Sequence, residues 1–223
     1  MRSVPLLQVA FDGIAADEML QVAGCVREYV DIFEIGTALL KQEGVKIITS
    51  FKTAYPEKLI FVDTKTLDLG RIEAQIVFQA GADFMSVCGI ASDETIRFTI
   101  EEAHARQKKV LVDLIGIEDT FRQMKRFTAL QPDYITIHAG VDERSKTNDL
   151  ERVDLFEKVE TVAQISPLPI AIAGGIQLDD LPYLIGFQPS ILVIGQAIVA
   201  APDPREKAKR FWQSLHSPFP TYL

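Results

Sequence analysis

The chain has 223 residues, of which 48% are hydrophobic, and a formal net charge of −8. A chain of this length can bury one large core, and we expect residues 1–223 to form a single domain with 214–223 as a C-terminal tail. The excess of acid argues against nucleic acid or an anionic membrane as the main partner.

Short β-rich apolar runs alternate along the chain with amphipathic helical patterns. The strand-like runs cover 6–11, 29–35, 59–64, 84–88, 110–115, 134–138, 169–173 and 191–194, and the clearest helical patterns cover 17–28, 68–79 and 93–107. Repeated strand–helix units predict an α/β protein whose eight parallel strands close into a single (β/α)8 TIM barrel. A doubly wound open sheet is the alternative, although it does not need eight units of such even spacing.

Two features bear on the compartment in which the protein works. No apolar run reaches the roughly 18 residues that span a bilayer, and the segment 1–5 lacks a signal-peptide pattern. The two cysteines, Cys25 and Cys88, lie in separate apolar segments, so we expect reduced thiols in the core. These features predict a cytoplasmic protein.

Polar residues gather where the predicted strands end. In a TIM barrel the chemistry lies at the carboxyl-terminal ends of the strands. The residues found at those ends are Asp12, Glu34, Asp63, Lys65, Asp113, His138, Gly174–Gly175 and Gly195–Gln196. Because alternate residues of a strand share one face, we expect the charged members to converge at one mouth of the barrel.

The third strand carries an Asp-x-Lys-x-x-Asp pattern made by Asp63, Lys65 and Asp68. Asp63 and Lys65 are two residues apart, so on a strand both point to the same side. Asp68 lies just past the strand end, where it serves either a different role or a different subunit. Burying such charges costs several kcal/mol, roughly, unless they are paired or bind a metal, and the pattern therefore predicts a functional site.

Glu34 and Asp63 are the candidate metal ligands. Two carboxylates from adjacent strands, with no cysteine and one histidine nearby, suit a hard cation such as Mg²⁺. The alternative is a structural ion pair with Lys65.

Lys65 and His138 are the candidate catalytic groups. Lys65 beside acids favours stabilisation of a developing oxyanion or proton donation; flanking carboxylates disfavour the neutral amine that a Schiff base needs, and simple charge balance is the alternative. His138 at a strand end suits a general base near neutral pH, although a lone histidine is often structural.

The small residues after the seventh and eighth strands are candidate phosphate contacts. Barrels often bind phosphate there through backbone N–H groups and a helix N-terminus. Gly174, Gly175, Gly195 and Gln196 occupy these positions. The alternative is that they form tight strand–helix turns.

Together these segments resemble the orotidine monophosphate decarboxylase suprafamily and, within it, the 3-hexulose-6-phosphate synthases. The Asp63-x-Lys65-x-x-Asp68 motif marks the suprafamily, and the likeness covers nearly the whole chain. The segments around Asp113 (112–119) and His138 (138–143) are similar to the synthases specifically.

The resemblance implies an Mg²⁺-dependent, reversible aldol condensation of formaldehyde with D-ribulose 5-phosphate to D-arabino-3-hexulose 6-phosphate. It assigns the metal to Glu34 and Asp63, proton removal from C1 to His138, and stabilisation of the enediolate to Lys65. It also implies substrate contacts from these residues: Asp12, Asp113, Asp142, Gly174, Gly175, Gly195 and Gln196. A homodimer follows, in which Asp68 reaches the partner's site.

Three alternatives differ from the synthases in identifiable residues. The related 3-keto-L-gulonate 6-phosphate decarboxylases carry an arginine three residues after the strand-six histidine, where this chain has Val141; the segment 63–66, however, is at least as similar to them. Orotidine monophosphate decarboxylases generally lack the acid equivalent to Glu34. A non-catalytic sugar-phosphate-binding barrel predicts loss of Asp63, Lys65, Asp68 or His138, all of which are present.

One departure concerns the phosphate end of the expected site. Many relatives have Gly-Arg after the eighth strand, whereas this chain has Gly195-Gln196. A neutral amide cannot make the charge-assisted bonds of a guanidinium. Weaker phosphate binding, or a different substrate, is expected.

Overall fold

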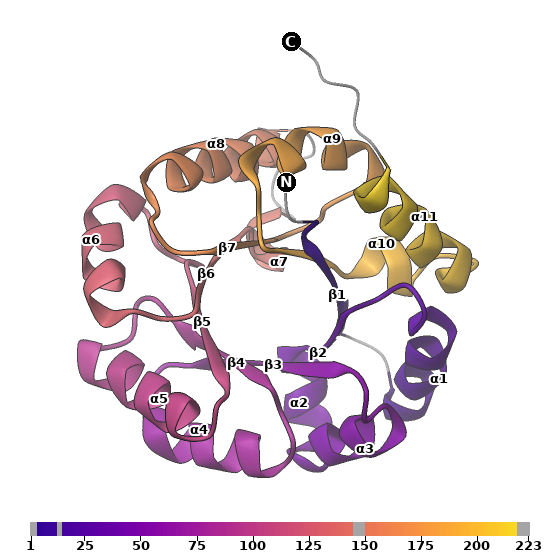
Figure 1. Cartoon of the computed structure of the whole chain (residues 1–223), viewed down its shortest axis with the longest axis horizontal. Helices are drawn as coiled ribbons and strands as arrows, with labels where there is room; N and C mark the ends of the chain where they lie inside the picture. Colours follow the sequence, from indigo (N-terminus) through magenta and orange to yellow (C-terminus); the bar gives the residue numbers. More distant parts are fainter. Residues whose placement is uncertain (1–3, 13–14, 145–149, 218–223) are drawn as a thin grey trace.

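A computed structural model describes residues 4–12, 15–144 and 150–217, and its eight parallel strands close into one barrel (Figure 1). The strands are β1 Leu6–Phe11, β2 Ile32–Ile35, β3 Leu59–Thr66, β4 Phe84–Cys88, β5 Lys109–Asp113, β6 Tyr134–His138, β7 Ile170–Ala173 and β8 Ile191–Ile194. Each strand pairs with the next along the chain, and β8 pairs with β1. The TIM-barrel prediction is confirmed, and the doubly wound alternative is wrong.

The helices form a ring around the barrel (Figure 1). They are α1 Ala16–Val26, α2 Thr37–Glu43, α3 Lys46–Ala54, α4 Gly70–Gln79, α5 Asp93–Ala105, α6 Thr120–Leu130, α7 Val141–Arg144, α8 Leu150–Ile165, α9 Leu181–Leu184, α10 Gln196–Val199 and α11 Pro204–His216, with 3-10 turns η1 Leu178–Asp180 and η2 Ile185–Phe187. Side-chain caps begin several of them: Ser92 accepts from the Thr95 N–H, and Asp203 from the Glu206 N–H. Such caps satisfy backbone donors that the first helical turn leaves unpaired.

Two strands begin or end at least two residues inside the apolar runs that predicted them. β2 begins at Ile32, because the Tyr29 N–H bonds back to the Val26 carbonyl at the end of α1. β5 ends at Asp113, whose carboxylate accepts the Ile115 N–H and turns the chain out of the sheet. Hydropathy cannot distinguish these turn residues from strand residues.

The core has two parts, inside and outside the strands. Inside the barrel, side chains from several strands fill the lower interior: Ile32, Phe61, Phe84, Leu111, Ala171 and Ile191. Outside, Phe33 packs edge-on against Phe11 and Phe51 between the sheet and α3. The barrel is therefore a packed scaffold rather than a pore, and a cavity opens at its carboxyl-terminal mouth.

The structure also bears on the expectations for the cysteines, the C-terminal segment and membrane-spanning helices. Cys88 is buried, but Cys25 on α1 is exposed, so its assignment to the core is wrong; both thiols are free. The last helix extends to His216, so residues 214–216 of the expected tail are helical, while 218–223 lie outside the described residues. No helix in the described ranges is both long enough and apolar enough to cross a membrane.

Candidate active site

A cavity of about 780 Å³ opens at the carboxyl-terminal mouth of the barrel, and all eight strands contribute to its lining. Eleven of the twelve predicted site residues line it. They are Asp12, Glu34, Asp63, Lys65, Asp113, His138, Asp142, Gly174, Gly175, Gly195 and Gln196. Barrel closure therefore brings together residues that are up to 184 positions apart in sequence (196 minus 12).

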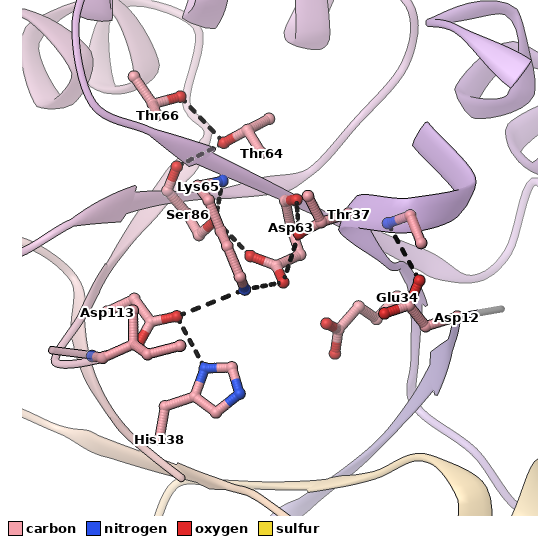
Figure 2. Close-up of polar contacts among 12 residues, drawn as sticks. Asp12, Glu34, Thr37, Asp63, Thr64, Lys65, Thr66, Ser86, Asp113 and His138 are labelled. Atoms are coloured by element: carbon pink, nitrogen blue, oxygen red, sulfur yellow. Dashed lines mark hydrogen bonds and ion pairs between the residues drawn. The ribbon is translucent and has the colours of Figure 1, made fainter. Parts of the chain in front are cut away.

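Asp113, which is buried, and His138, which is half-buried, form a dyad at the ends of β5 and β6 (Figure 2). The His138 Nδ1 lies 2.8 Å from Asp113 Oδ2, and the Ile115 N–H donates to Asp113 Oδ1 at 2.9 Å. Burial lowers the pKa of His138, but the bond to Asp113 outweighs it and leaves that pKa above its ordinary value. Burial raises the pKa of Asp113, and its bond to His138 reverses this, so the pKa of Asp113 is lowered. With Nδ1 bonded to the carboxylate, Nε2 is the ring nitrogen left to act on a ligand.

Lys65 extends between two acids of the cavity wall (Figure 2). Its Nζ makes a short ion pair with Asp63 Oδ2 and lies 3.8 Å from Asp113 Oδ2. Burial lowers the pKa of Lys65, but Asp63, Asp113 and Glu34 outweigh burial and raise it. Lys65 is therefore a fixed ammonium, suited to a developing negative charge and not to nucleophilic attack.

Glu34 lies across the cavity from the dyad and is buried on β2. Gln8 Nε2 donates to Glu34 Oε2 at 2.7 Å. Burial, reinforced by the charge on Asp63, raises the pKa of Glu34 to about 8. This carboxyl therefore holds its proton near neutral pH, even with the Lys65 ammonium in the same cavity.

Gln8 leaves one polar atom without a partner. Its Oε1 is buried and makes no hydrogen bond, the one such buried side-chain atom over the part of the chain that the structure describes. A buried acceptor left unsatisfied is unusual and points to a missing donor or cation. The orphaned oxygen belongs to the side chain that holds Glu34.

The acids of the cavity outnumber its cations. Among the described lining residues, five carboxylates (Asp12, Glu34, Asp63, Asp113 and Asp142) face one ammonium, that of Lys65, and one imidazole. No group of three or more His, Cys, Asp or Glu side chains in the described ranges is arranged to hold a metal by itself. Mg²⁺ does not need such a group, since it keeps several waters and commonly shares one or two carboxylates with its substrate. The residues present therefore fit a hard divalent cation held by Glu34 and Asp63.

Asp12 is held at the opposite side of the mouth from the dyad. Its Oδ1 accepts the Ala38 N–H at 3.0 Å, at the start of α2. A Cβ placed on Gly36 would lie 2.7 Å from the Asp12 Cβ, which real structures do not tolerate. The glycine at position 36 is therefore what allows Asp12 to approach α2.

Glycines with left-handed backbone shape the wall after β7. Gly174 and Gly175 have φ of 124° and 66°, and a Cβ on Gly174 would lie 2.8 Å from Ala139. Gly195 precedes the short helix α10, which begins at Gln196. Gly174, Gly175, Gly195 and Gln196 all line the cavity, and no arginine or further lysine joins them among the described lining residues.

Asp68 is the predicted site residue that lies apart. It is exposed, its Oδ1 accepts the N–H of the adjacent Leu69, and it does not line the cavity of its own chain. The prediction that Asp68 lies just past the end of β3 is thus confirmed. Within one chain, Asp68 does not lie with the other predicted site residues.

The side chains that bond Glu34 and Asp63, apart from Lys65, were not predicted as site residues: Gln8, Thr37 and Ser86. Thr37 bonds Asp63 Oδ2 at 2.9 Å, and Ser86 bonds Asp63 Oδ1 at 2.8 Å. The available signals were weak. Gln8 is a polar residue on the inward face of β1, and Ser86 is a polar residue inside the apolar strand β4.

The chain is similar over nearly its whole length to proteins of one known family. The model of the orotidine 5'-phosphate decarboxylase / HUMPS family matches residues 5–211. A 3-hexulose-6-phosphate synthase from Mycobacterium gastri is 40% identical over 203 residues, covering 91% of this chain and 96% of the relative. The structure of the Salmonella typhimurium 3-hexulose-6-phosphate synthase is 31% identical with a TM-score of 0.89, covering 94% and 98% of the two chains. A 3-keto-L-gulonate-6-phosphate decarboxylase from Vibrio cholerae is 24% identical with a TM-score of 0.83 over 96% and 98%, which shows a common fold alone.

Asp113→Asn is expected to lower the pKa of His138, because a neutral amide replaces the carboxylate that raises it. NMR titration of the imidazole C–H resonances measures this directly, since the chain has three histidines and His104 and His216 serve as internal references. A His138 pKa that is the same in both proteins would contradict the dyad.

The raised pKa of His138 predicts that this residue contributes to the free energy of unfolding in a pH-dependent way. A histidine whose folded-state pKa is raised stabilises the fold fully below its unfolded pKa, about 6.5, and this contribution is lost as the pH rises through the folded-state value. The difference in unfolding free energy between the wild type and Asp113→Asn should therefore shrink as the pH rises through that window, which urea denaturation at several pH values measures.

Proposed function

This chain belongs to the orotidine 5'-phosphate decarboxylase / HUMPS family, and on that premise we propose that it is a 3-hexulose-6-phosphate synthase, an aldehyde-lyase. The reaction is the reversible aldol condensation of formaldehyde with D-ribulose 5-phosphate to D-arabino-3-hexulose 6-phosphate. The 40% identity to a synthase over nearly the full length of both chains carries this proposal. The acid, ammonium and imidazole groups around one cavity support it.

Mg²⁺ is proposed as the cofactor because the cavity needs positive charge. A sugar phosphate is an anion, and it would enter a cavity whose described lining holds five acidic side chains and one ammonium. The raised pKa of Glu34 and the unpartnered Oε1 of Gln8 mark the point where a cation would relieve the imbalance. When bound by Glu34 and Asp63, Mg²⁺ would supply Lewis-acid stabilisation of charge on the sugar oxygens.

His138 is proposed to remove the C1 proton of ribulose 5-phosphate through Nε2. Asp113 holds the ring by Nδ1 and stabilises the imidazolium that forms. The Lys65 ammonium would stabilise the negative charge that develops on the sugar oxygens as the proton leaves. The resulting enediolate carbon attacks formaldehyde, the C–C bond forms, and the formaldehyde oxygen takes up a proton to give the hydroxymethyl group.

The sugar and its phosphate are proposed to lie along the rest of the wall. Asp12 and Asp142 would accept hydrogen bonds from sugar hydroxyls. The backbone of Gly174–Gly175 and the first turn of α10 at Gly195–Gln196 would bind the phosphate through N–H groups. Because Gln196 supplies no cation, this end relies on neutral donors, and phosphate affinity is lower than a guanidinium would give.

The competing activity is decarboxylation of 3-keto-L-gulonate 6-phosphate, which passes through a similar enediolate. Val141 lines the cavity at its rim and is exposed, where the decarboxylases are expected to carry an arginine. An apolar side chain cannot replace that cation, so the synthase reaction is favoured.

A second copy of the chain is proposed to complete the site with Asp68. Exposed apolar residues flank this acid in the sequence and lie on and near α4 and α5. These two helices pack together, with the Arg71 guanidinium 5.0 Å from the centre of the Phe98 ring. The exposed apolar side chains are Leu67, Leu69, Ile72, Ile76, Ile90 and Phe98. Exposed apolar groups of this extent are typical of a subunit interface, and a symmetric dimer would bury them while delivering Asp68 to the partner's cavity.

Purified protein with D-ribulose 5-phosphate and Mg²⁺ is expected to consume formaldehyde, and EDTA is expected to abolish the reaction reversibly. Glu34→Ala and Asp63→Ala should each lose activity at all Mg²⁺ concentrations, whereas exposed Glu57→Ala serves as the acid-to-alanine control. Full activity of the metal-stripped wild type would contradict the cofactor. Release of CO2 from 3-keto-L-gulonate 6-phosphate without formaldehyde consumption would establish the decarboxylase instead.

Co-expression of Asp68→Ala with His138→Ala is expected to restore activity that neither variant has alone. If Asp68 crosses the interface, each mixed dimer holds one intact site, so roughly a quarter of wild-type activity returns after random assembly. Asp63→Ala with His138→Ala is the matched control and should restore none, because both residues belong to the same chain's cavity. No recovery from the first pair, with mixed dimers present, would contradict a shared site.

A further inference from the structure

The end of β3 departs from regular strand geometry at its functional lysine. Lys65 has a φ of 47°, a left-handed conformation that side-chain-bearing residues rarely adopt. The pairing with β4 shifts here, since Val62 lies opposite Met85 but Thr66 lies opposite Val87. Four residues of β3 therefore span two residues of β4, and the Lys65 side chain is aimed by this bulge rather than by a regular strand.

One residue of β4, Ser86, contacts the bulge through both its hydroxyl and its backbone carbonyl (Figure 2). The Ser86 hydroxyl accepts the Lys65 N–H at 3.0 Å and donates to Asp63 Oδ1 at 2.8 Å. The Ser86 carbonyl accepts the Thr64 hydroxyl at 2.5 Å. A serine hydroxyl has one proton to give, and here it gives it to Asp63 while using an acceptor position for the lysine backbone.

The surroundings of Ser86 show that its hydroxyl faces the site rather than the outer core. Ser86 is 2% exposed and lines the cavity, whereas its neighbours Met85 and Val87 belong to the apolar layer beneath the helices. An alanine would fill this position of an apolar strand equally well. The hydroxyl thus serves the two polar groups that it bonds.

We propose that Ser86 is a positioning residue that holds the left-handed turn at Lys65 and the orientation of Asp63, so that the ammonium and the carboxylate face the same substrate atoms. This rests on the proposed function, in which Lys65 stabilises the enediolate. Strained backbone persists where surrounding bonds fix it, and Ser86 supplies the bond to the strained residue itself. Without it, the Lys65 turn relaxes and the Nζ moves away from Asp113.

Ser86→Ala is expected to lower kcat for formaldehyde consumption at least about tenfold, because a displaced Lys65 ammonium stabilises the transition state less well. The KM for ribulose 5-phosphate should change less than about threefold. Ser86→Thr keeps the hydroxyl and should restore most of the rate. Thr128→Ala on α6 is the control, because it removes a hydroxyl bonded only to the Met124 carbonyl, away from the cavity. Wild-type kcat in Ser86→Ala, or a Thr variant as slow as the Ala variant, would overturn the proposal.

Hydrogen exchange of the Lys65 amide tests the same proposal without any measurement of enzyme activity. Exchange of this N–H should be protected in the wild type and in Ser86→Thr and faster in Ser86→Ala, with the β4 amides unchanged. Unchanged exchange at Lys65 would overturn the positioning role even if the rate falls. A wild type that shows the exchange pattern but does not consume formaldehyde would contradict the proposed function and leave the role of Ser86 in holding Lys65 intact.

Discussion

The feature on which the site depends is an excess of acidic side chains in the cavity at the carboxyl-terminal mouth of the barrel. Among the lining residues that the structure describes, closing eight parallel strands places five acidic side chains and one ammonium at the end of a packed barrel. Acids this close repel one another in a medium of low dielectric constant, and each must be held by donors or by a cation. Asp63 is held by Thr37, Lys65 and Ser86, and Asp113 by His138 and a backbone N–H.

The same crowding gives the acids different protonation behaviour. Asp113 has a lowered pKa because His138 and Lys65 outweigh its burial, whereas burial and Asp63 raise the pKa of Glu34 to about 8. Acidic groups whose pKa values are shifted in opposite directions are typical of sites that move protons. In the proposed reaction, the ionised Asp113 supports the base, and Glu34 gives up its proton when a cation takes its place.

Sequence reasoning predicted the residues of the site better than the contacts between them. Strand periodicity placed Asp12, Glu34, Asp113 and His138 on inward faces, because alternation follows directly from strand geometry. It did not predict that Asp113 would bond His138, since this depends on the register between β5 and β6 and on how the chain turns at Ile115. The left-handed Lys65 was also beyond periodicity, which treats β3 as regular, and for that reason Ser86 was missed. Cys25 was misplaced because an apolar neighbourhood in sequence does not fix which helix face a residue occupies.

The proposed chemistry requires Glu34 and Asp63 to bind a divalent cation together with the sugar phosphate. Calorimetric titration of Mg²⁺ into the protein, in the presence of saturating D-ribulose 5-phosphate, tests it most directly. We expect one Mg²⁺ per chain in the wild type, and affinity weakened at least about tenfold, the equivalent of about 1.4 kcal/mol, in Glu34→Gln and in Asp63→Asn. Absence of binding to the wild type, or equal affinity in all three proteins, would contradict the account.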